Sequence, residues 1–240
     1  MIARLIDNFC ANRYTKIMSQ HSTFGFKGDF RFVAERLAIG RGGRVLAADL
    51  NFALHAGEAL VVTGPNGAGK STLLRMLAGL LAPLAGRIAI SGAGIEPDAQ
   101  AGFCAHYLGH ADALKSALTV SENLQFWAAM LGAPGERVEI ALATVGLSHV
   151  ADVPAGYLSA GQKRRVALAR LLVAHRPLWL LDEPATGLDA ASQKKLADMM
   201  GAYRQQGGVV IAATHAPLGL DGAQELRLAA AMASNDGAPE

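Results

Sequence analysis

The sequence predicts an α/β fold with a parallel β-sheet, a smaller antiparallel β layer and a helical subdomain, and three observations predict it. Short, nearly continuous apolar runs at 59–63, 178–181 and 209–213 alternate with helix-type segments, which is typical of strands that pair in parallel through right-handed crossovers. Glycine-broken β-type runs precede the first of these strands. Finally, 240 residues that are 51% hydrophobic and 18% charged are enough to bury the core of one large domain.

The sequence of the N-terminal third predicts an extension, the antiparallel layer and the first core strand. Residues 1–33 scatter aromatic side chains among polar ones without a sustained period, so we expect a poorly ordered extension there. The main domain is expected over 34–232, followed by a loose tail over 233–240. The runs 37–39, 45–46 and 50–54 predict the antiparallel layer. A buried strand at 59–63 then leads through a glycine-rich turn into a helix over 70–78.

The rest of the chain predicts the helical subdomain, over about 110–170, and the remaining core strands. Thr119 and Glu122 form a capping-box pattern ahead of an apolar-periodic helix that extends to about residue 131. Further helices are expected over 136–145, 161–174 and 190–203, with strands over 178–181 and 209–213.

Charge, cysteines and hydropathy exclude several classes of protein. A net charge of +2 gives no strong field for binding nucleic acid or an anionic membrane. Cys10 and Cys104 lie far apart, so we expect buried thiols in a reducing compartment and neither a disulfide nor a zinc site. The longest stretch without charged residues, 205–220, contains His215 and Pro217 and cannot be a span of about 20 apolar residues. Without a secretory signal pattern, a cytoplasmic chain is expected.

The glycine-rich turn is predicted to bind phosphate. Its sequence is Gly64, Pro65, Asn66, Gly67, Ala68, Gly69, Lys70 and Ser71, which matches GxxxxGK[ST] between a strand and a helix. Glycines let backbone N–H groups turn toward phosphate oxygens. Lys70 is expected to reach the β- and γ-phosphates and Ser71 to coordinate Mg²⁺, with Thr72 also in the cradle. The alternative is a plain glycine turn with a surface lysine.

Two carboxylates follow the apolar strand at 178–181. Asp182 is expected to hold Mg²⁺, largely through water, and Glu183 to polarise the attacking water. By itself, an Asp-Glu pair after a strand is as typical of an ordinary turn as of a catalytic site. The pair indicates a catalytic site only in combination with the phosphate loop.

The segment Leu158-Ser159-Ala160-Gly161-Gln162 resembles the LSGGQ signature of the ABC-transporter ATPases, and it precedes a helix. The simpler interpretation is a serine N-cap before a basic, solvated helix face at 163–165. The resemblance implies a P-loop NTPase fold, the ABC nucleotide-binding domain, with ATP and Mg²⁺ as cofactors. It further implies a head-to-tail homodimer in which Ser159 and the Gly161 amide cap the γ-phosphate bound to the opposite subunit.

Other positions extend or depart from the family pattern. Residues 186–189 resemble the D-loop, although Asp189 is also a plausible plain N-cap, and His215 matches the switch histidine that contacts the γ-phosphate. His110 occupies the place of the usual Q-loop glutamine. Arg41 stands where an aromatic residue usually stacks on adenine, and its guanidinium plane can also stack on a base.

Residues 34–230 are most similar to the ATPase subunit of the cytochrome c maturation system, the haem exporter. The similarity depends on His110, Lys115, the Trp127 helix and the segment 158–170. It implies integral membrane subunits as partners and a peripheral location on the cytoplasmic face of the inner membrane. Haem or a haem chaperone would be handled by the complex and not by this chain, and no direct nucleic-acid contact is expected. The alternatives are an ABC ATPase for another transported substrate, or a soluble ABC ATPase acting on nucleic acid or ribosomes.

Overall fold

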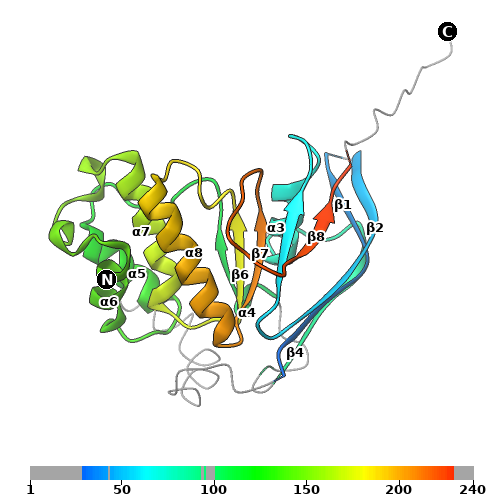
Figure 1. Ribbon diagram of the computed structural model, residues 1–240, viewed down its shortest axis with the longest axis horizontal. Helices are drawn as coiled ribbons and strands as arrows, with labels where there is room; N and C mark the ends of the chain where they lie inside the picture. Colours follow the sequence, from blue (N-terminus) through cyan, green and yellow to red (C-terminus); the bar gives the residue numbers. More distant parts are fainter. Residues whose placement is uncertain (1–28, 43, 93–94, 96–100, 230–240) are drawn as a thin grey trace, which may run out of the picture.

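A computed structural model describes residues 29–229, apart from residues 43, 93–94 and 96–100. Its central sheet has five strands in the order β5-β6-β7-β3-β8, and all neighbouring strands are parallel (Figure 1). The strands are β3 (Ala59–Thr63), β5 (Ala105–Leu108), β6 (Leu178–Asp182), β7 (Val209–Ala213) and β8 (Gln224–Arg227). Every residue of β6 and β7 is buried, as expected of parallel strands covered on both faces.

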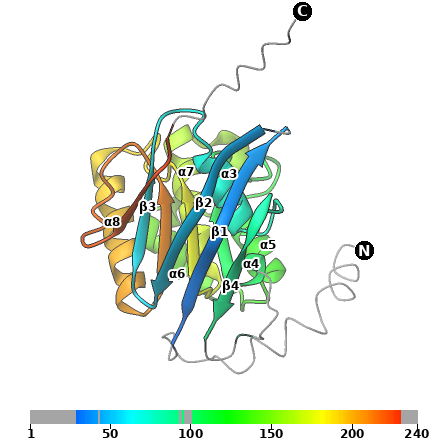
Figure 2. The ribbon, with the colours of Figure 1, turned by 90° about the vertical axis from the view of Figure 1, so that its right-hand side faces the viewer.

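A second, antiparallel sheet flanks the first and has the order β2-β1-β4 (Figure 2). It consists of β1 (Arg31–Arg41), β2 (Arg44–His55) and β4 (Ala85–Ser91). Helix α3 (Lys70–Leu77) contacts β1 on one side and β6 and β7 on the other. Leu37 of β1, Leu74 of α3 and Leu180 of β6 therefore share one core. The predicted α/β fold with an antiparallel β layer is confirmed.

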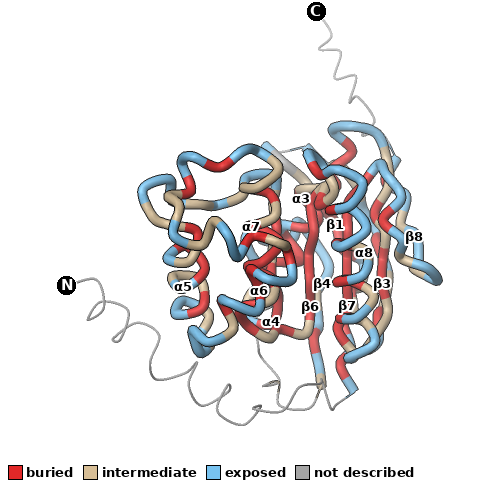
Figure 3. Tube along the Cα trace, turned by 60° about the vertical axis from the view of Figure 1, so that its left-hand side comes forward, coloured by how far each residue is buried: buried red, intermediate tan, exposed pale blue. Residues whose placement is uncertain are grey.

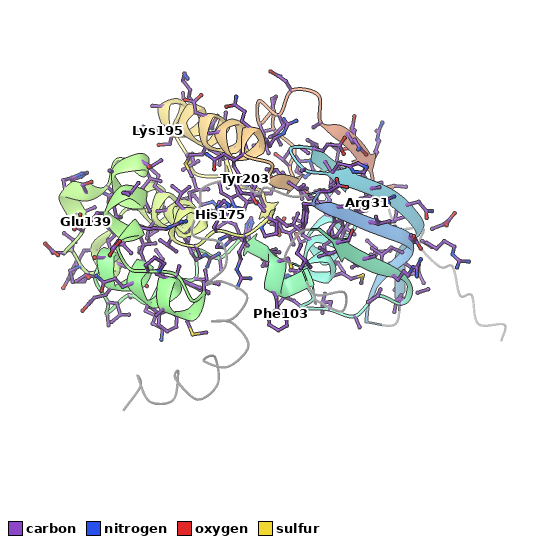
Figure 4. All side chains as sticks on the ribbon, turned by 90° about the horizontal axis from the view of Figure 1, so that it is seen from below. Arg31, Phe103, Glu139, His175, Lys195 and Tyr203 are labelled. Carbon is purple, nitrogen blue, oxygen red and sulfur yellow. The ribbon has the colours of Figure 1, made fainter. Side chains whose placement is uncertain are left out.

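On the opposite face of the parallel sheet, α7 (Ala160–Val173) and α8 (Ala190–Gln205) pack on the strands (Figure 1). Helices α5 (Val120–Met130) and α6 (Arg137–Val145) pack on α7 on the side away from the sheet, with 3-10 turns at Ser148–Val150 and Ala155–Tyr157. Trp179 stacks on Tyr203 of α8 with ring centroids 3.9 Å apart, and the Tyr203 hydroxyl donates to the Arg176 carbonyl at 2.5 Å. Tyr203 lies inside the molecule, whereas Glu139 and Lys195 lie on its outer surface (Figure 4). Buried residues accordingly follow the strands and the inner sides of these helices (Figure 3).

The start of the domain is the main correction to the expected boundaries. Residues 29–33, predicted to belong to the extension, lead into and begin β1, and the Phe30 and Phe32 side chains are 3% and 0% exposed. Phe32 also packs on the Phe52 ring at 6.1 Å, so the antiparallel sheet requires this segment. Residues 1–28 and the predicted tail at 233–240 lie outside the described residues.

Among the described elements, β4, β5, β8, the short helix α4 (Ala101–Cys104) and the two 3-10 turns were not predicted. Of the two cysteines, Cys104 is buried, as predicted, while Cys10 lies outside the described residues. In the part of the chain that the structure describes, no helix combines the length and the apolar character that crossing a bilayer requires.

Candidate functional site

The strand order brings three predicted loops to one edge of the parallel sheet. Strand β7 pairs with β6 on one side and with β3 on the other, so the carboxyl ends of all three strands are neighbours. The glycine-rich loop follows β3, Asp182 ends β6 and His215 lies two residues after β7. Open α/β sheets bind their ligands at this edge.

Positive φ angles shape the glycine-rich loop. Gly64, Gly67 and Gly69 have φ values of 140°, 81° and 101°, conformations that are costly for residues with a Cβ. A Cβ on Gly64 would also collide with the Leu228 carbonyl of the neighbouring chain segment. Glycine is therefore required at Gly64 both by its backbone conformation and by the close approach of residue 228.

Helix α3 begins without a side-chain cap, as α6 does, but unlike α5, α7 and α8. Thr119, Ser159 and Asp189 each accept a hydrogen bond from a first-turn amide of α5, α7 and α8, whereas α3 has no such cap and no acidic residue in its first turn. The first-turn amides of a helix have no intrahelical partner and carry the positive end of the helix dipole. The N-terminus of α3, at Lys70, is therefore available to an anion.

The Lys70 ammonium lies inside the loop. Its Nζ donates to the Gly64 carbonyl at 2.7 Å and to the Pro65 carbonyl at 3.2 Å, and it lies 2.8 Å from His215 Nε2. Lys70 is only 8% exposed, and it forms no ion pair with any described residue. A buried cation without an acidic partner is costly, and a phosphate in the cradle would neutralise it.

His215 joins the other side chains of the site. Its Nε2 lies 3.0 Å from Asn66 Oδ1 and 3.7 Å from Glu183 Oε1, in addition to the Lys70 contact. One ring nitrogen cannot serve all three partners at once. Unprotonated, Nε2 accepts from Lys70; protonated, it donates to Asn66 or to the Glu183 carboxylate. The imidazole is thus placed to change partners when a charged ligand enters.

Ser71 and Asp182 form an oxygen-only pair that fits Mg²⁺. The Ser71 hydroxyl donates to Asp182 Oδ1 at 3.0 Å, across 111 positions of sequence, and Asp182 is 3% exposed. No cluster of three or more metal-binding side chains occurs among the described residues. A hard cation such as Mg²⁺ is commonly held by one or two protein oxygens together with substrate phosphates and water, and this pair matches that requirement.

Glu183 follows β6 in a strained backbone conformation. Its φ is 47°, in the left-handed region that few residues other than glycine adopt, and its amide donates to the Ala213 carbonyl at 2.9 Å. Backbone strain of this kind clusters at functional sites. The turn directs the carboxylate toward His215 and hence toward the phosphate loop.

Three predicted residues, Ser159, Gly161 and His110, stand apart from this cluster. Ser159 caps α7, and no hydrogen bond or ion pair within the described chain joins it or Gly161 to the phosphate loop. A Cβ on Gly161 would lie 3.4 Å from the Gly187 carbonyl, which places the start of α7 beside the 186–189 loop. His110 is exposed two residues after β5. The side chain of Arg41, the last residue of β1, lies outside the described part of the chain.

Asp189 is an N-cap, one of the two roles considered from the sequence. Its Oδ1 accepts from the Ser192 amide at 2.8 Å. Hydrogen bonding from Ser192 lowers the pKa of Asp189, which keeps the cap ionised at the start of α8.

Two residues beside the site, Arg164 and Tyr107, were not predicted from the sequence. The simpler interpretation of 163–165 as a solvated basic face does not hold for Arg164, which is 5% exposed and donates to the backbone of the Glu183 turn. The Tyr107 hydroxyl is buried and lies next to the Arg75 and Asp182 side chains. Burial raises its pKa; Arg75 acts in the opposite direction, and the Asp182 carboxylate raises the pKa further. The only feature of the sequence that could have drawn attention to Tyr107 is its position two residues before Gly109.

Comparisons with known proteins agree with this geometry. The model of a family described as "ABC transporter" matches residues 47–186, more than half of the chain. A "Cytochrome c biogenesis ATP-binding export protein CcmA" from Chelativorans sp. (strain BNC1) is 53% identical over 205 residues, covering 83% of this chain and 98% of that protein. The protein of the same name from Mesorhizobium japonicum is 53% identical over 201 residues, covering 84% of this chain and 99% of that protein.

Solved structures show the same fold at lower identity. A putative ABC transporter ATP-binding protein from Pyrococcus furiosus superimposes with a TM-score of 0.72 at 24% identity, covering 82% of this chain and 97% of that one. A bacterial Atm1-family ABC exporter with ATP bound gives a TM-score of 0.70 at 24% identity, covering 85% of this chain and 38% of that one. At these identities the similarity supports the fold alone.

Proposed function

This chain belongs to the ABC transporter family of ATP-binding proteins, and we propose that it is the ATP-hydrolysing subunit of a membrane complex for cytochrome c biogenesis. ATPases of this family bind ATP and work with membrane subunits. The family match supports ATP as the nucleotide. The 53% sequence identity with each of the two export proteins supports the role in cytochrome c biogenesis.

Hydrolysis in this proposal depends on three side chains at the sheet edge. The backbone amides of the glycine-rich loop and of the first turn of α3 hold the phosphates, and Lys70 neutralises the β- and γ-phosphates. Glu183 polarises the attacking water. His215, already within 2.8 Å of Lys70 Nζ, turns toward the γ-phosphate when the nucleotide enters.

The remaining predicted residues complete the nucleotide site. Ser71 and Asp182 hold Mg²⁺, which supplies charge stabilisation for the phosphoryl group when it is bound. Ser159 and the Gly161 amide, at the start of α7, cap the γ-phosphate of a second copy in a head-to-tail dimer. This arrangement accounts for their separation from Lys70 within one chain. Arg41 stacks on the adenine through its guanidinium plane.

The work of hydrolysis is delivered to integral membrane subunits at the cytoplasmic face of the inner membrane. His110 is exposed at the edge of the sheet next to the site and senses those subunits. The complex, and not this chain, handles haem or a haem-loaded chaperone. The sequence identity with the cytochrome c biogenesis export proteins supports this assignment over transport of another substrate.

One observation carries the ATPase assignment. Lys70, His215 and Glu183 follow three neighbouring strands, and Lys70 begins the uncapped helix α3. His215 Nε2 lies 2.8 Å from Lys70 Nζ and 3.7 Å from Glu183 Oε1. Replacing Glu183 with Gln should leave ATP binding intact and lower the hydrolysis rate about 100- to 10,000-fold, because only water polarisation is lost. The ATP-bound dimer should then accumulate in size-exclusion chromatography with MgATP. Full ATPase activity with only monomer present would remove Glu183 from this role.

A further inference from the structure

Arg164 makes five hydrogen bonds, three of which join helix α7 to the turn of residues 182–184 that contains Glu183. Arg164 lies in the second turn of α7. Its Nη2 donates to the Glu183 carbonyl at 2.7 Å and to the Asp182 carbonyl at 3.2 Å. Its Nε donates to the Pro184 carbonyl at 3.3 Å. We propose that Arg164 is a positioning residue for ATP hydrolysis that holds the 182–184 turn, and with it the Glu183 carboxylate, in the productive orientation.

The geometry of the turn explains why such a residue is needed. In an extended strand successive carbonyls point to opposite sides, yet the three carbonyls of residues 182–184 all reach one guanidinium. Glu183 leaves the strand with φ 47°, a strain that persists only where the surroundings fix the conformation. The Ala213 carbonyl fixes the Glu183 amide, and Arg164 fixes the carbonyl that follows it.

The same guanidinium reaches the segment that contains His110. Arg164 Nη1 donates to the Gly109 carbonyl at 3.0 Å and to Asp112 Oδ1 at 3.2 Å. Four of its five acceptors are backbone carbonyls, so the cation is compensated mainly by main-chain dipoles. The arrangement ties segment 109–112 to the Glu183 turn through one rigid, planar side chain.

A matched control lies six positions further along the same helix. Arg170 is 6% exposed, donates to the Tyr107 carbonyl at 2.7 Å and lies 4.5 Å from the Trp127 ring centroid, but it has no hydrogen bond to residues 182–184. Both arginines are buried on α7, so a general loss of packing or charge compensation should affect Arg164→Gln and Arg170→Gln alike. Only the first should disturb Glu183.

The test compares steady-state ATP hydrolysis and thermal unfolding of Arg164→Lys, Arg164→Gln and Arg170→Gln in the full chain. Both Arg164 variants should lower kcat at least about tenfold and leave KM for ATP within about threefold, because the phosphate loop is untouched. Arg170→Gln should keep kcat within about threefold at a similar loss of melting temperature. Wild-type kcat in Arg164→Lys, or an equal loss of kcat in Arg170→Gln, would overturn the proposal even if Arg164→Gln failed to fold.

A double mutant shows whether Arg164 acts through Glu183. The inference rests on the proposed role of Glu183 in hydrolysis, which Glu183→Gln tests separately. If that role holds, adding Arg164→Gln to Glu183→Gln should not lower the single-turnover rate further, since the group being positioned is already gone. A further fall by the factor seen in the wild-type background would mean that Arg164 acts elsewhere. Unchanged hydrolysis in Glu183→Gln alone would reject the proposed function instead.

Discussion

Ser159 combines a structural and a proposed functional role that one pair of substitutions can separate. Its Oγ accepts from the Gln162 amide at 3.2 Å, while the Gln162 side chain accepts from the Ser159 amide at 2.9 Å. Thr119 makes the same reciprocal contacts with Glu122 on α5, at 3.1 and 2.8 Å. A hydroxyl that accepts the capping hydrogen bond still has its own O–H to donate. Ser159 can therefore cap α7 and bind a phosphate simultaneously.

The expected stability losses of Ser159→Ala and Thr119→Ala are similar. Each removes an N-cap acceptor, which costs about 1 kcal/mol, and a domain of this size should lose about 2–4 °C in melting temperature. A hydrogen bond to a charged group is worth about 1.5–3 kcal/mol. Ser159→Ala should therefore also lower the hydrolysis rate roughly 10- to 100-fold, while Thr119→Ala should not.

Differential scanning fluorimetry and steady-state ATPase assays measure the two effects on the same preparations. Ser159→Thr, which keeps the hydroxyl, serves as the control and should retain most of the activity. Equal melting temperatures for the two alanine variants together with wild-type hydrolysis in Ser159→Ala would refute the phosphate role, and Ser159 would be an N-cap only.

Five further substitutions, grouped in three comparisons, test the phosphate loop and the sensing position. Lys70→Ala removes the buried ammonium and should weaken binding of a fluorescent ATP analogue at least about tenfold; unchanged affinity would contradict its phosphate contact. Gly64→Ala forces a Cβ against the Leu228 carbonyl at φ 140° and should cost about 2–5 kcal/mol in thermal unfolding, whereas Gly67→Ala, with open space around it, should cost about 1–2 kcal/mol; equal losses would contradict the steric argument. His110→Gln should keep the stimulation of ATPase activity by membrane subunits and His110→Ala should lose it, while equal loss in both would refute a hydrogen-bonding sensor.

The core strands were predictable because their sequences carry one dominant signal. Strands β3 and β7 match the predicted ranges 59–63 and 209–213 residue for residue, since both faces of a parallel sheet are buried and favour continuous apolar runs. The unpredicted β8 lies at the edge of the sheet and consists of the polar sequence QELR. Its pairing with β3 is a tertiary effect that its own residues do not encode.

The start of β1 was missed for a local reason. Phe30 and Phe32 follow the two-residue alternation of a strand, but the register with β2 shifts between Ala34 and Leu37, where Arg36 adopts a φ of 48°. This irregularity breaks the alternation before the pattern resumes at Leu37. A strand of 11 residues therefore looks like a short run preceded by an aperiodic segment.

The site was predictable where its chemistry is contiguous in sequence. Lys70, Ser71 and Asp182 lie in motifs, and the structure brings all three together. Arg164 lies in a run of three basic residues, 163–165, which looks solvated in the sequence. Successive helix residues are 100° apart, so such a run spans about 200° and cannot all face water on a packed helix. Which of the three turns inward depends on carbonyls about 20 positions away.

The most direct test of the account is whether ATP use by this chain is required for covalent haem attachment to c-type cytochromes. A deletion strain of its host is complemented with the wild-type gene or with Lys70→Ala, and c-type cytochromes are detected by haem staining after denaturing electrophoresis. We predict that the wild-type gene restores the stained bands and that Lys70→Ala, expressed at the same level, does not, while b-type cytochromes remain normal in both strains. Normal haem attachment with Lys70→Ala would contradict the cytochrome c assignment.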